Sequence, residues 1–490
     1  MSDVLKVLFL SPEAVPFAKT GGLADVAGAL PEALKRLGAD VRMALPFYRI
    51  MRERDSQTRP LLKDLKISLG TETLAANVLG TQTEGGVPVS LIEREDLYDR
   101  PNLYGTPEGD YYDNLERFTF FAHAALKTAE ALSFKPDVIH CHDWQTGLVP
   151  ALMKGPYGAT PFFRGTPTVF TIHNIGYQGL FQAQKIALTG LSSQQFFHME
   201  GLEYYGRISL LKAGIVYSDA VTTVSPTYAR EIQTPEYGKG MDGILRHRRT
   251  SLRGILNGVD YQLWNPSRDT LIPANYSTQK MAGKPQCKEA LIHEMALNES
   301  LEKKPLLGMI SRLDSQKGLD LLVQILDDIL ALDVGLVLLG SGDDRIQRAI
   351  HKAAKSNRGR VGLKIGFDEP LAHRIMAGAD IFLVPSRYEP CGLTQMYALK
   401  YGTVPVVRAT GGLDDTILQF DPRTGKGNGF KFKPYEAAAF LEAVRGAAEL
   451  FLDPKAWKKV MANGMKADFS WERSAQSYLE LYESLTTRSV

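Results

Sequence analysis

A glycine-rich turn near the amino terminus combines a lysine with a strand before it and a helix after it. The segment Lys19–Gly28 follows the apolar run Leu5–Leu10, and apolar residues after the turn recur at helical spacing. Paired glycines let a ligand approach the backbone closely, and the first N–H groups of a helix attract anions. The turn predicts an anion site to which Lys19 adds positive charge; glycines that serve only packing are the alternative.

Other polar residues with possible chemistry also follow predicted strands. In the first half of the chain these are His140–Asp143 and His173–Asn174. In the second half they are Arg312, Lys317 and the segment Arg387–Gly392. Parallel α/β sheets bind ligands at the carboxyl ends of their strands, so all of these positions are candidate binding residues.

The sequence favours basic side chains over a metal ion for holding a phosphate. His140, His142 and Asp143 invite a metal interpretation, but no further ligand stands at a suitable spacing, and no Asp-x-Asp occurs in the chain. Arg312 and Lys317 are five residues apart across a strand-to-helix turn, and both side chains can bind phosphate oxygens. We therefore expect no metal, with a solvated turn as the alternative for the basic pair.

A carboxylate stands just before a predicted helix in Glu389-Pro-Cys-Gly-Leu-Thr394. The N–H groups of Gly392 to Thr394 suit an anion, so Glu389 is expected to bond sugar hydroxyls or a developing positive charge. Cys391 lacks the His or Asn arrangement that supports a nucleophile, and we interpret it as a small residue packed in the turn.

Composition restricts the class of protein. A chain of 490 residues is too long for one core and predicts two or three domains. With 57 basic and 55 acidic residues, the charge gives no support for nucleic acid or an anionic membrane as partner. Three widely spaced cysteines imply no disulfide framework. With neither a signal-peptide pattern nor a membrane-spanning run, we expect a cytoplasmic protein.

Strand-like runs alternate with amphipathic helices, which predicts two Rossmann-like, doubly wound α/β domains facing each other across a cleft. The first covers residues 1–255 and the second residues 256–470. Residues 471–490 form a helix with one aromatic face, for which the N-terminal domain is the candidate packing surface. Residues 50–115 are expected to be less regular, with a long functional loop at 100–106.

The same pattern predicts strands and helices along both halves of the chain. Strands are expected near 5–10, 40–45, 137–140, 168–172, 220–224, 304–310, 336–339, 361–366, 381–384 and 404–407. Helices are expected near 114–132, 287–295, 318–330, 343–355, 369–377 and 392–401, and one begins at Pro226 behind a Ser225 cap. Thr410–Asp415 follows its strand much as Thr20–Asp25 follows the first one, which indicates two related half-sites.

Together the motifs resemble bacterial glycogen synthase and plant starch synthase. The matching segments are Lys19-Thr-Gly-Gly-Leu, Thr171-Ile-His-Asn174, Asn257-Gly-Val-Asp, Ser311-Arg-Leu with Lys317-Gly, Glu389-Pro-Cys-Gly-Leu-Thr-Gln395 and Thr410-Gly-Gly-Leu. They span nearly the whole chain in order. The resemblance implies a GT-B type glycosyltransferase that needs no metal or other cofactor. It also implies retaining transfer of glucose from ADP-glucose to the non-reducing 4-OH of an α-1,4-glucan such as glycogen.

The resemblance also implies roles for individual residues. Catalytic roles near the sugar and the leaving phosphate fall to His173, Glu389, Arg312, Lys317 and Asp143. Substrate-binding roles fall to Lys19, Gly22, Asp25, Tyr104, Asn174, Asn257, Cys391, Gly392, Leu393 and Thr394. Related retaining transferases often carry a second Glu eight positions after the first, but position 397 is Tyr here, so that role is not carried over.

Three alternatives stay open. An α-glucan phosphorylase shares the broad fold but requires a lysine-bound pyridoxal phosphate. A UDP-sugar-dependent transferase acting on a small acceptor is the second, because the residues alone do not decide the base of the donor. A noncatalytic glucan-binding protein is the third, and it is disfavoured because such surfaces need exposed aromatic side chains, whereas the candidates here are charged.

Overall fold

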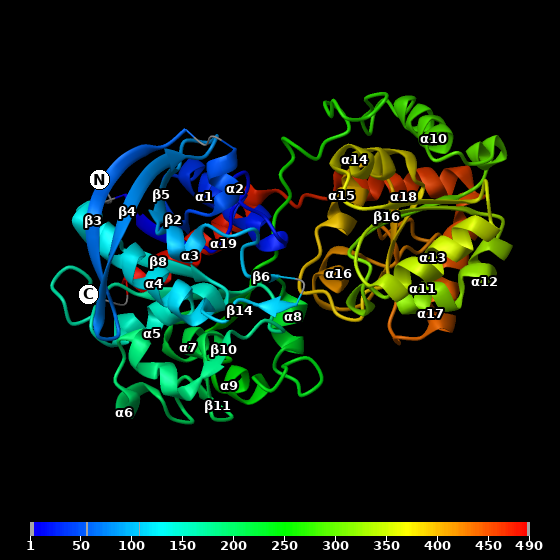
Figure 1. The fold of residues 1–490 in the computed structure, drawn as a ribbon. Helices are drawn as coiled ribbons and strands as arrows, with labels where there is room; N and C mark the ends of the chain where they lie inside the picture. Colours follow the sequence, from blue (N-terminus) through cyan, green and yellow to red (C-terminus); the bar gives the residue numbers. More distant parts are fainter. Residues whose placement is uncertain (1–3, 55–56, 107, 488–490) are drawn as a thin grey trace. The chain divides into compact units, whose positions relative to one another are not determined.

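The computed structural model describes residues 4–54, 57–106 and 108–487. It contains two compact units, Met1–Gly258 with Trp471–Val490, and Val259–Ser470 (Figure 1). Each unit is an α/β fold around a largely or wholly parallel sheet, as predicted. The division lies between Gly258 and Val259, whereas the sequence placed it at residue 255, so Asn257 belongs to the first unit.

The first unit is built on a nine-stranded sheet in the order β14-β13-β9-β8-β1-β2-β5-β4-β3. Its parallel strands are β1 (Lys6–Leu10), β2 (Asp40–Pro46), β5 (Pro88–Glu93), β8 (Val138–His142), β9 (Thr168–Ile172), β13 (Ala220–Thr223) and β14 (Leu252–Gly254). The central strands β1, β8 and β9 are almost entirely buried, which is why they appear in the sequence as continuous apolar runs.

Residues 59–93 are not irregular, so that part of the sequence interpretation was wrong. They form β3 (Arg59–Leu69), β4 (Glu72–Gln82) and β5, with β3 and β4 added antiparallel at one end of the sheet. Most of β3 is exposed, and its pairing with β4 shifts register twice between Pro60 and Leu65. These irregularities remove the clean alternation of apolar and polar residues by which a strand is recognised.

The second unit has a six-stranded parallel sheet in the order β17-β16-β15-β18-β19-β20. Its strands are β15 (Leu306–Ile310), β16 (Gly335–Gly340), β17 (Val361–Ile365), β18 (Ile381–Val384), β19 (Val404–Arg408) and β20 (Phe430–Phe432). A hydrophobic core lies on each face of the sheet. In Figure 1, α14 (Glu369–Gly378) and α15 (Thr394–Lys400) lie on one side, and α13 (Asp344–Ser356) lies on the other.

Most predicted helices are present with small shifts at their ends. They are α4 (Asn114–Ala131), α8 (Pro226–Glu231), α10 (Gly283–Glu294), α11 (Leu319–Gln324) with α12 (Leu326–Ala331), and α13 to α15. The Ser225 hydroxyl caps α8 by accepting a hydrogen bond from the N–H of Tyr228, as the Ser-Pro pair predicted. Residues 430–466, for which no element was predicted, form β20, α17 (Ala437–Phe451) and α18 (Pro454–Lys466).

The last helix, α19 (Trp471–Thr486), belongs to the first unit and packs beside α1 (Gly22–Arg36) (Figure 1). Its buried side chains include Trp471, Tyr478 and Tyr482. The Ser474 hydroxyl donates to the carbonyl of Leu256 over 2.6 Å. The aromatic face noted in the sequence therefore fills a position against the N-terminal domain. Across the described ranges, no helix is both long and apolar enough to span a membrane.

Candidate active site

In both units the candidate residues flank the point where the strand order reverses. The first unit reverses between β1 and β8, and the second between β15 and β18. Lys19 and Asp143 follow the first pair of strands, while Lys317 and Glu389 follow the second pair. Open α/β sheets bind ligands in the crevice that such a reversal leaves at the carboxyl ends of the strands.

Glu13 supports the glycine-rich turn of the first unit through hydrogen bonds to Thr20. This buried carboxylate accepts hydrogen bonds from both the N–H and the hydroxyl of Thr20, over 2.6 and 2.7 Å. The turn ends where α1 begins at Gly22, with Gly21 as its N-cap. A side chain at Gly28 would lie 2.8 Å from the carbonyl of Val15, whereas the space around Gly21 is open. Packing therefore explains Gly28 and leaves Gly21 open to a ligand.

Lys19 lies at the rim of this turn in an ion pair. Its ammonium is 2.7 Å from Asp25, and the two side chains are 48% and 29% exposed. The pair is therefore accessible to solvent, and an incoming anion can compete with Asp25 for the ammonium.

Asp143 follows β8 in an unusual backbone conformation. Its φ of 55° with ψ of −179° is a region that residues other than glycine rarely occupy, at a cost of about 1–3 kcal/mol. Its carboxylate accepts the N–H of His173 over 2.7 Å. Burial raises the pKa of Asp143 to about 7, although the N–H groups of His173 and Asn174 oppose this shift. Strained backbone and a buried carboxylate at a strand end are features of functional sites.

Tyr48 and Tyr104 lie close enough to the Glu13 carboxylate for its charge to raise their pKa values. Burial, followed by the charges of Glu13, Tyr48 and Asp143, raises the pKa of Tyr104. Burial also raises the pKa of Glu13, to about 7. Among the described residues, the buried hydroxyls of Tyr48 and Tyr104 have no hydrogen-bond partner. We call these four residues the carboxylate–tyrosine cluster, and its unused hydroxyls can bond the hydroxyl groups of a polar ligand.

The remaining candidates of the first unit have distinct surroundings. His173 is buried, and burial lowers its pKa to about 3, so the ring is neutral near pH 7. Asn174 uses its side-chain oxygen to accept the N–H of Gly176 over 2.9 Å, which shapes the turn after β9. The buried amide oxygen of Asn257 has no partner within the described ranges, so it can accept a hydrogen bond from a ligand.

Replacing Asp143 by asparagine is expected to stabilise the fold at alkaline pH. Because folding raises the pKa of Asp143 above its unfolded value, its stabilising contribution is present below about pH 4 and is lost as pH rises to about 7. Asparagine keeps an oxygen acceptor, carries no charge and tolerates positive φ. We expect Asp143→Asn to gain about 1–3 kcal/mol at about pH 8 and less at about pH 5, measured by thermal unfolding.

The control for this prediction is Asp137→Asn. Asp137 is exposed and accepts the backbone N–H of Lys6 over 2.8 Å, so its replacement should show no comparable gain with rising pH. If the melting temperature of Asp143→Asn stayed at or below that of wild type at both pH values, the prediction that a buried charge at Asp143 destabilises the fold would be wrong.

The second unit pairs two candidate residues that are distant in sequence. The ammonium of Lys317 lies 2.6 Å from Glu389, and their side chains are 21% and 9% exposed. The Ser386 hydroxyl donates to the same carboxylate oxygen over 2.9 Å. Lys317 thus offsets the charge of Glu389, which explains how a carboxylate can stand next to a predicted phosphate site.

Arg312 is more exposed and is oriented by neighbours in its own turn. Its guanidinium is 3.0 Å from Asp314 and donates to Gln316 over 3.0 Å, with 54% of the side chain exposed. Both Arg312 and Lys317 lie in the turn between β15 and α11. Two cations at a strand end can bind the oxygens of one diphosphate.

The second Thr-Gly-Gly-Leu motif packs closely against the backbone of the Glu389 turn. A side chain at Gly411 would lie 1.9 Å from the carbonyl of Glu389, and one at Gly412 would lie 2.2 Å from the carbonyl of Cys391. The two glycines let α16 (Gly411–Thr416) approach this backbone closely. Cys391 is buried in the turn, as interpreted from sequence.

Residues 392–394 complete this turn before α15. Gly392 adopts a φ of +69°, in the left-handed region where other residues are strained. Leu393 is the N-cap of α15, and Thr394 is its first residue. The N–H groups of this helix start therefore lie directly after the Glu389 carboxylate, as the sequence predicted.

The histidines around β8 form hydrogen bonds with neighbouring side chains. His140 bonds to Thr171 and Tyr482, and His142 bonds to His173. Within the described part of the chain, no group of three or more His, Cys, Asp or Glu residues is placed to hold one metal ion.

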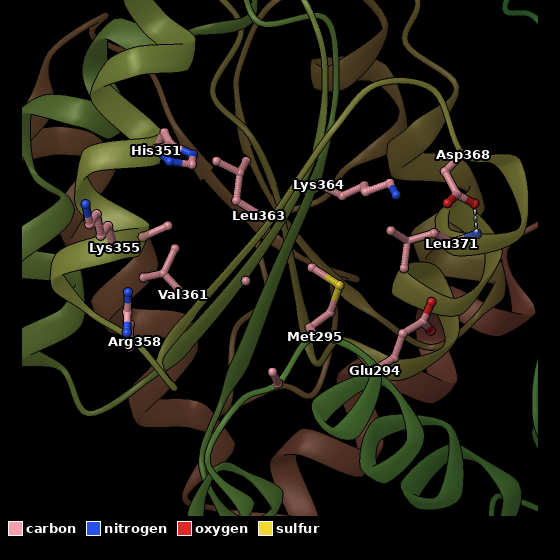
Figure 2. A pocket seen from close by; sticks show the side chains of 13 residues that line it. Glu294, Met295, His351, Lys355, Arg358, Val361, Leu363, Lys364, Asp368 and Leu371 are labelled. Atoms are coloured by element: carbon pink, nitrogen blue, oxygen red, sulfur yellow. Dashed lines mark hydrogen bonds between the residues drawn. The ribbon is translucent and has the colours of Figure 1, made fainter.

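A cavity of about 610 Å³ in the second unit lies away from these residues. Figure 2 shows its walls, with His351, Lys355 and Arg358 on one side of β17 and Asp368 with Leu371 on the other. None of the candidate residues lines this cavity. We take the strand ends as the candidate active site, because parallel α/β sheets bind ligands where their strands end.

Several further candidate residues were missed by the reasoning from sequence. Glu13 follows β1 directly, so the rule that selected the other strand-end residues could have selected it as well. Tyr48 follows β2 in the same way. Ser386 precedes Glu389 by three residues but carries no recognisable signal, because its role depends on where the turn aims its hydroxyl.

Comparisons with known proteins agree with this architecture. The model of the starch synthase catalytic domain matches residues 6–247, and that of glycosyl transferases group 1 matches residues 294–464. A glycogen synthase from Moorella thermoacetica is 48% identical over 490 residues, covering 100% of this chain and 98% of that protein. Glycogen synthase 2 from Geobacter metallireducens is 46% identical over 480 residues, covering 98% and 99%.

A solved structure is also closely similar. It is the catalytic domain of starch synthase IV from Arabidopsis thaliana bound to ADP and acarbose, with a TM-score of 0.91 and 35% identity. The match covers 99% of this chain and 100% of that one. With full-length relatives this similar and strand-end residues of the expected kinds, the chain belongs to the glycogen synthase and starch synthase family of GT-B type glycosyltransferases.

Proposed function

We propose that the chain is an ADP-glucose-dependent glycogen synthase. It would transfer glucose with retention from ADP-glucose to the non-reducing 4-OH of an α-1,4-glucan. The observation that carries this proposal is the Lys317–Glu389 pair at the strand reversal of the second unit, with Arg312 in the same turn. A starch synthase relative solved with ADP and acarbose supports a donor built on ADP.

The basic residues have a direct role in the proposed chemistry. When the anomeric carbon–oxygen bond breaks, negative charge builds on the departing ADP and positive charge builds on the sugar ring. Arg312 and Lys317 stabilise the phosphate, and one preorganised contact of this kind contributes roughly 3 kcal/mol. Glu389 bonds hydroxyl groups of the glucose. Because side-chain cations neutralise the leaving group, we propose that transfer needs no metal ion or other cofactor.

The first unit supplies polar groups for the sugar and the acceptor. Lys19 binds donor phosphate when it releases Asp25, and the carboxylate–tyrosine cluster bonds hydroxyl groups of glucose or the acceptor. His173 and Asn174 lie at the neighbouring strand end. Gly22, Gly392, Leu393 and Thr394 serve through their backbone N–H groups at helix starts, and Cys391 packs the turn.

Retention is proposed to follow a same-face route. The bond between the anomeric carbon and the phosphate oxygen breaks, and the acceptor 4-oxygen bonds to the same face of that carbon. The proton of the 4-OH passes to the departing phosphate oxygen, so no protein nucleophile is required. Isolation of a covalent glucosyl–enzyme adduct would contradict this route.

Glucose transfer onto glycogen tests the proposal. We expect transfer from ADP-glucose to exceed transfer from UDP-glucose and to persist with a chelator present. A preference for UDP-glucose would favour the UDP-sugar alternative. Glycogen binding without transfer from either donor would favour the noncatalytic alternative, and a pyridoxal phosphate absorbance band would favour a phosphorylase. We expect this activity in the cytoplasm, where free thiols such as those of the three described cysteines persist.

A further inference from the structure

We infer that His142 is a positioning residue that determines which ring nitrogen of His173 carries the proton. With His142 as donor, His173 accepts at Nε2 and keeps its own proton on Nδ1. His173 then acts as a neutral N–H donor toward a substrate oxygen, a consequence that rests on the proposed function. The tautomer itself is a property of the free protein.

One hydrogen bond joins the two imidazole rings. His142 Nδ1 lies 2.9 Å from His173 Nε2, and both side chains are buried. His142 is the last residue of β8, and its register partner on β9 is Thr171, two positions before His173. The parallel pairing of two central strands therefore holds the rings in place.

Both rings are neutral, so only one of them donates in this bond. Burial lowers the pKa of His173 to about 3 and holds the pKa of His142 well below its usual range. A neutral imidazole carries a single N–H, on either Nδ1 or Nε2. The position of the proton on His142 therefore decides its position on His173.

The surroundings of the other His142 nitrogen select the donor. His142 Nε2 is buried and has no hydrogen-bond partner in the described part of the chain. The rings of Phe9 and His140 lie 4.2 and 4.0 Å from the His142 ring, centre to centre. A proton on Nε2 would be a buried N–H without an acceptor, which is rarer in proteins than a buried acceptor without a donor. His142 therefore carries its proton on Nδ1 and donates it to His173.

The His140 ring, which packs against His142, is hydrogen-bonded at both of its nitrogens. His140 Nε2 lies 2.6 Å from the Thr171 hydroxyl, and His140 Nδ1 lies 2.7 Å from the hydroxyl of Tyr482. Tyr482 belongs to α19, so the last helix of the chain supports the ring against which His142 packs. The orientation of His142 thus depends on residues from both ends of the first unit.

The chemical consequence concerns what His173 can do. With Nε2 occupied as an acceptor and burial opposing a positive charge, the ring cannot serve as a general base. Its Nδ1–H can donate to a hydroxyl or ring oxygen of the sugar. The backbone N–H of His173 meanwhile holds Asp143, so the two candidate residues are oriented together.

The test compares His142→Phe with His142→Asn. Phenylalanine keeps a flat ring without a donor, whereas an asparagine amide N–H can take the place of Nδ1–H. Long-range proton–nitrogen NMR correlation on protein with ¹⁵N-labelled histidine reports the tautomer without substrate. We expect Nδ1–H on His173 in wild type, with the ¹⁵N shift of a hydrogen-bonded acceptor at Nε2. His142→Asn should keep that Nε2 shift, and His142→Phe should lose it because nothing then donates to Nε2. We also expect kcat of His142→Phe to fall about 10–10²-fold with KM little changed, and His142→Asn to keep most of the rate.

His123→Phe is the matched control. His123 is buried in the same unit and bonds Tyr157 and the Thr189 carbonyl, each over 3.0 Å. Its loss should lower the melting temperature but leave kcat and the His173 tautomer unchanged. A wild-type His173 proton on Nε2, or an unchanged Nε2 shift and kcat in His142→Phe, would overturn the inference. If no glucose transfer occurs in any variant, the proposed function fails while the NMR result still decides the tautomer.

Discussion

Glucose transfer from ADP-glucose falls by at least about 10²-fold when Lys317 is replaced by alanine. The ammonium lies 2.6 Å from Glu389, and only 21% of the Lys317 side chain is exposed to solvent. Its charge is therefore little screened and can act on a leaving phosphate at the same strand end. The measurement is the initial rate of glucose incorporation into glycogen at saturating donor.

A second variant separates the loss of charge from a loss of stability. Lys317→Ala leaves Glu389 buried with Ser386 as its one remaining side-chain partner among the residues that the structure describes, which costs about 3 kcal/mol of folding free energy. The double variant Lys317→Met with Glu389→Gln removes both charges. We expect it to recover most of the melting temperature while transfer stays low, because the cation at the leaving group is still missing.

Lys304→Ala is the control for charge alone. Lys304 pairs with Asp333 over 2.9 Å in the same unit, but the side chains are 36% and 67% exposed. Exposed pairs contribute about 0–1 kcal/mol, so this variant should keep normal transfer and stability. A Lys317→Ala protein that folds normally and keeps near-normal transfer would show that the second-unit site is misplaced.

Replacing Lys19 by alanine is also expected to lower transfer by at least about 10²-fold, with almost no change in stability. Lys19 stands beside the open glycine turn, where its ammonium can exchange Asp25 for donor phosphate. Because the ion pair is largely accessible to water, breaking it costs at most about 1 kcal/mol of folding free energy. The checks are the same transfer assay and a thermal unfolding curve.

Lys154 provides a closely matched comparison in the same unit. It pairs with Asp219 over 2.7 Å with side chains 48% and 30% exposed, against 2.7 Å, 48% and 29% for Lys19 and Asp25. Lys154→Ala should therefore change stability by as little as Lys19→Ala and leave transfer intact. Equal transfer by the two variants would remove Lys19 from the donor site.

The alternation of strands and helices could be predicted because burial determines which residues in a short segment are apolar. Central parallel strands such as Thr168–Ile172 are covered on both faces, so their residues are apolar without interruption. The hairpin of β3 and β4 was missed because β3 is largely exposed and its pairing shifts register, so its residues do not alternate regularly between apolar and polar. The candidate residues followed from the strands, since ligands bind where parallel strands end.

Partnerships between these residues could not be predicted, because they depend on which strands become neighbours. Lys317 and Glu389 are 72 positions apart and meet because β15 and β18 pair at the strand reversal. His140 and Tyr482 are 342 positions apart and meet only because α19 returns to the first unit. By itself, the sequence determined the fold class, the strand ends and the kinds of residue placed there. The tertiary structure decided which charges are paired, which hydroxyls are unused and which histidine orients another, because those properties arise from distances between atoms that periodicity does not encode.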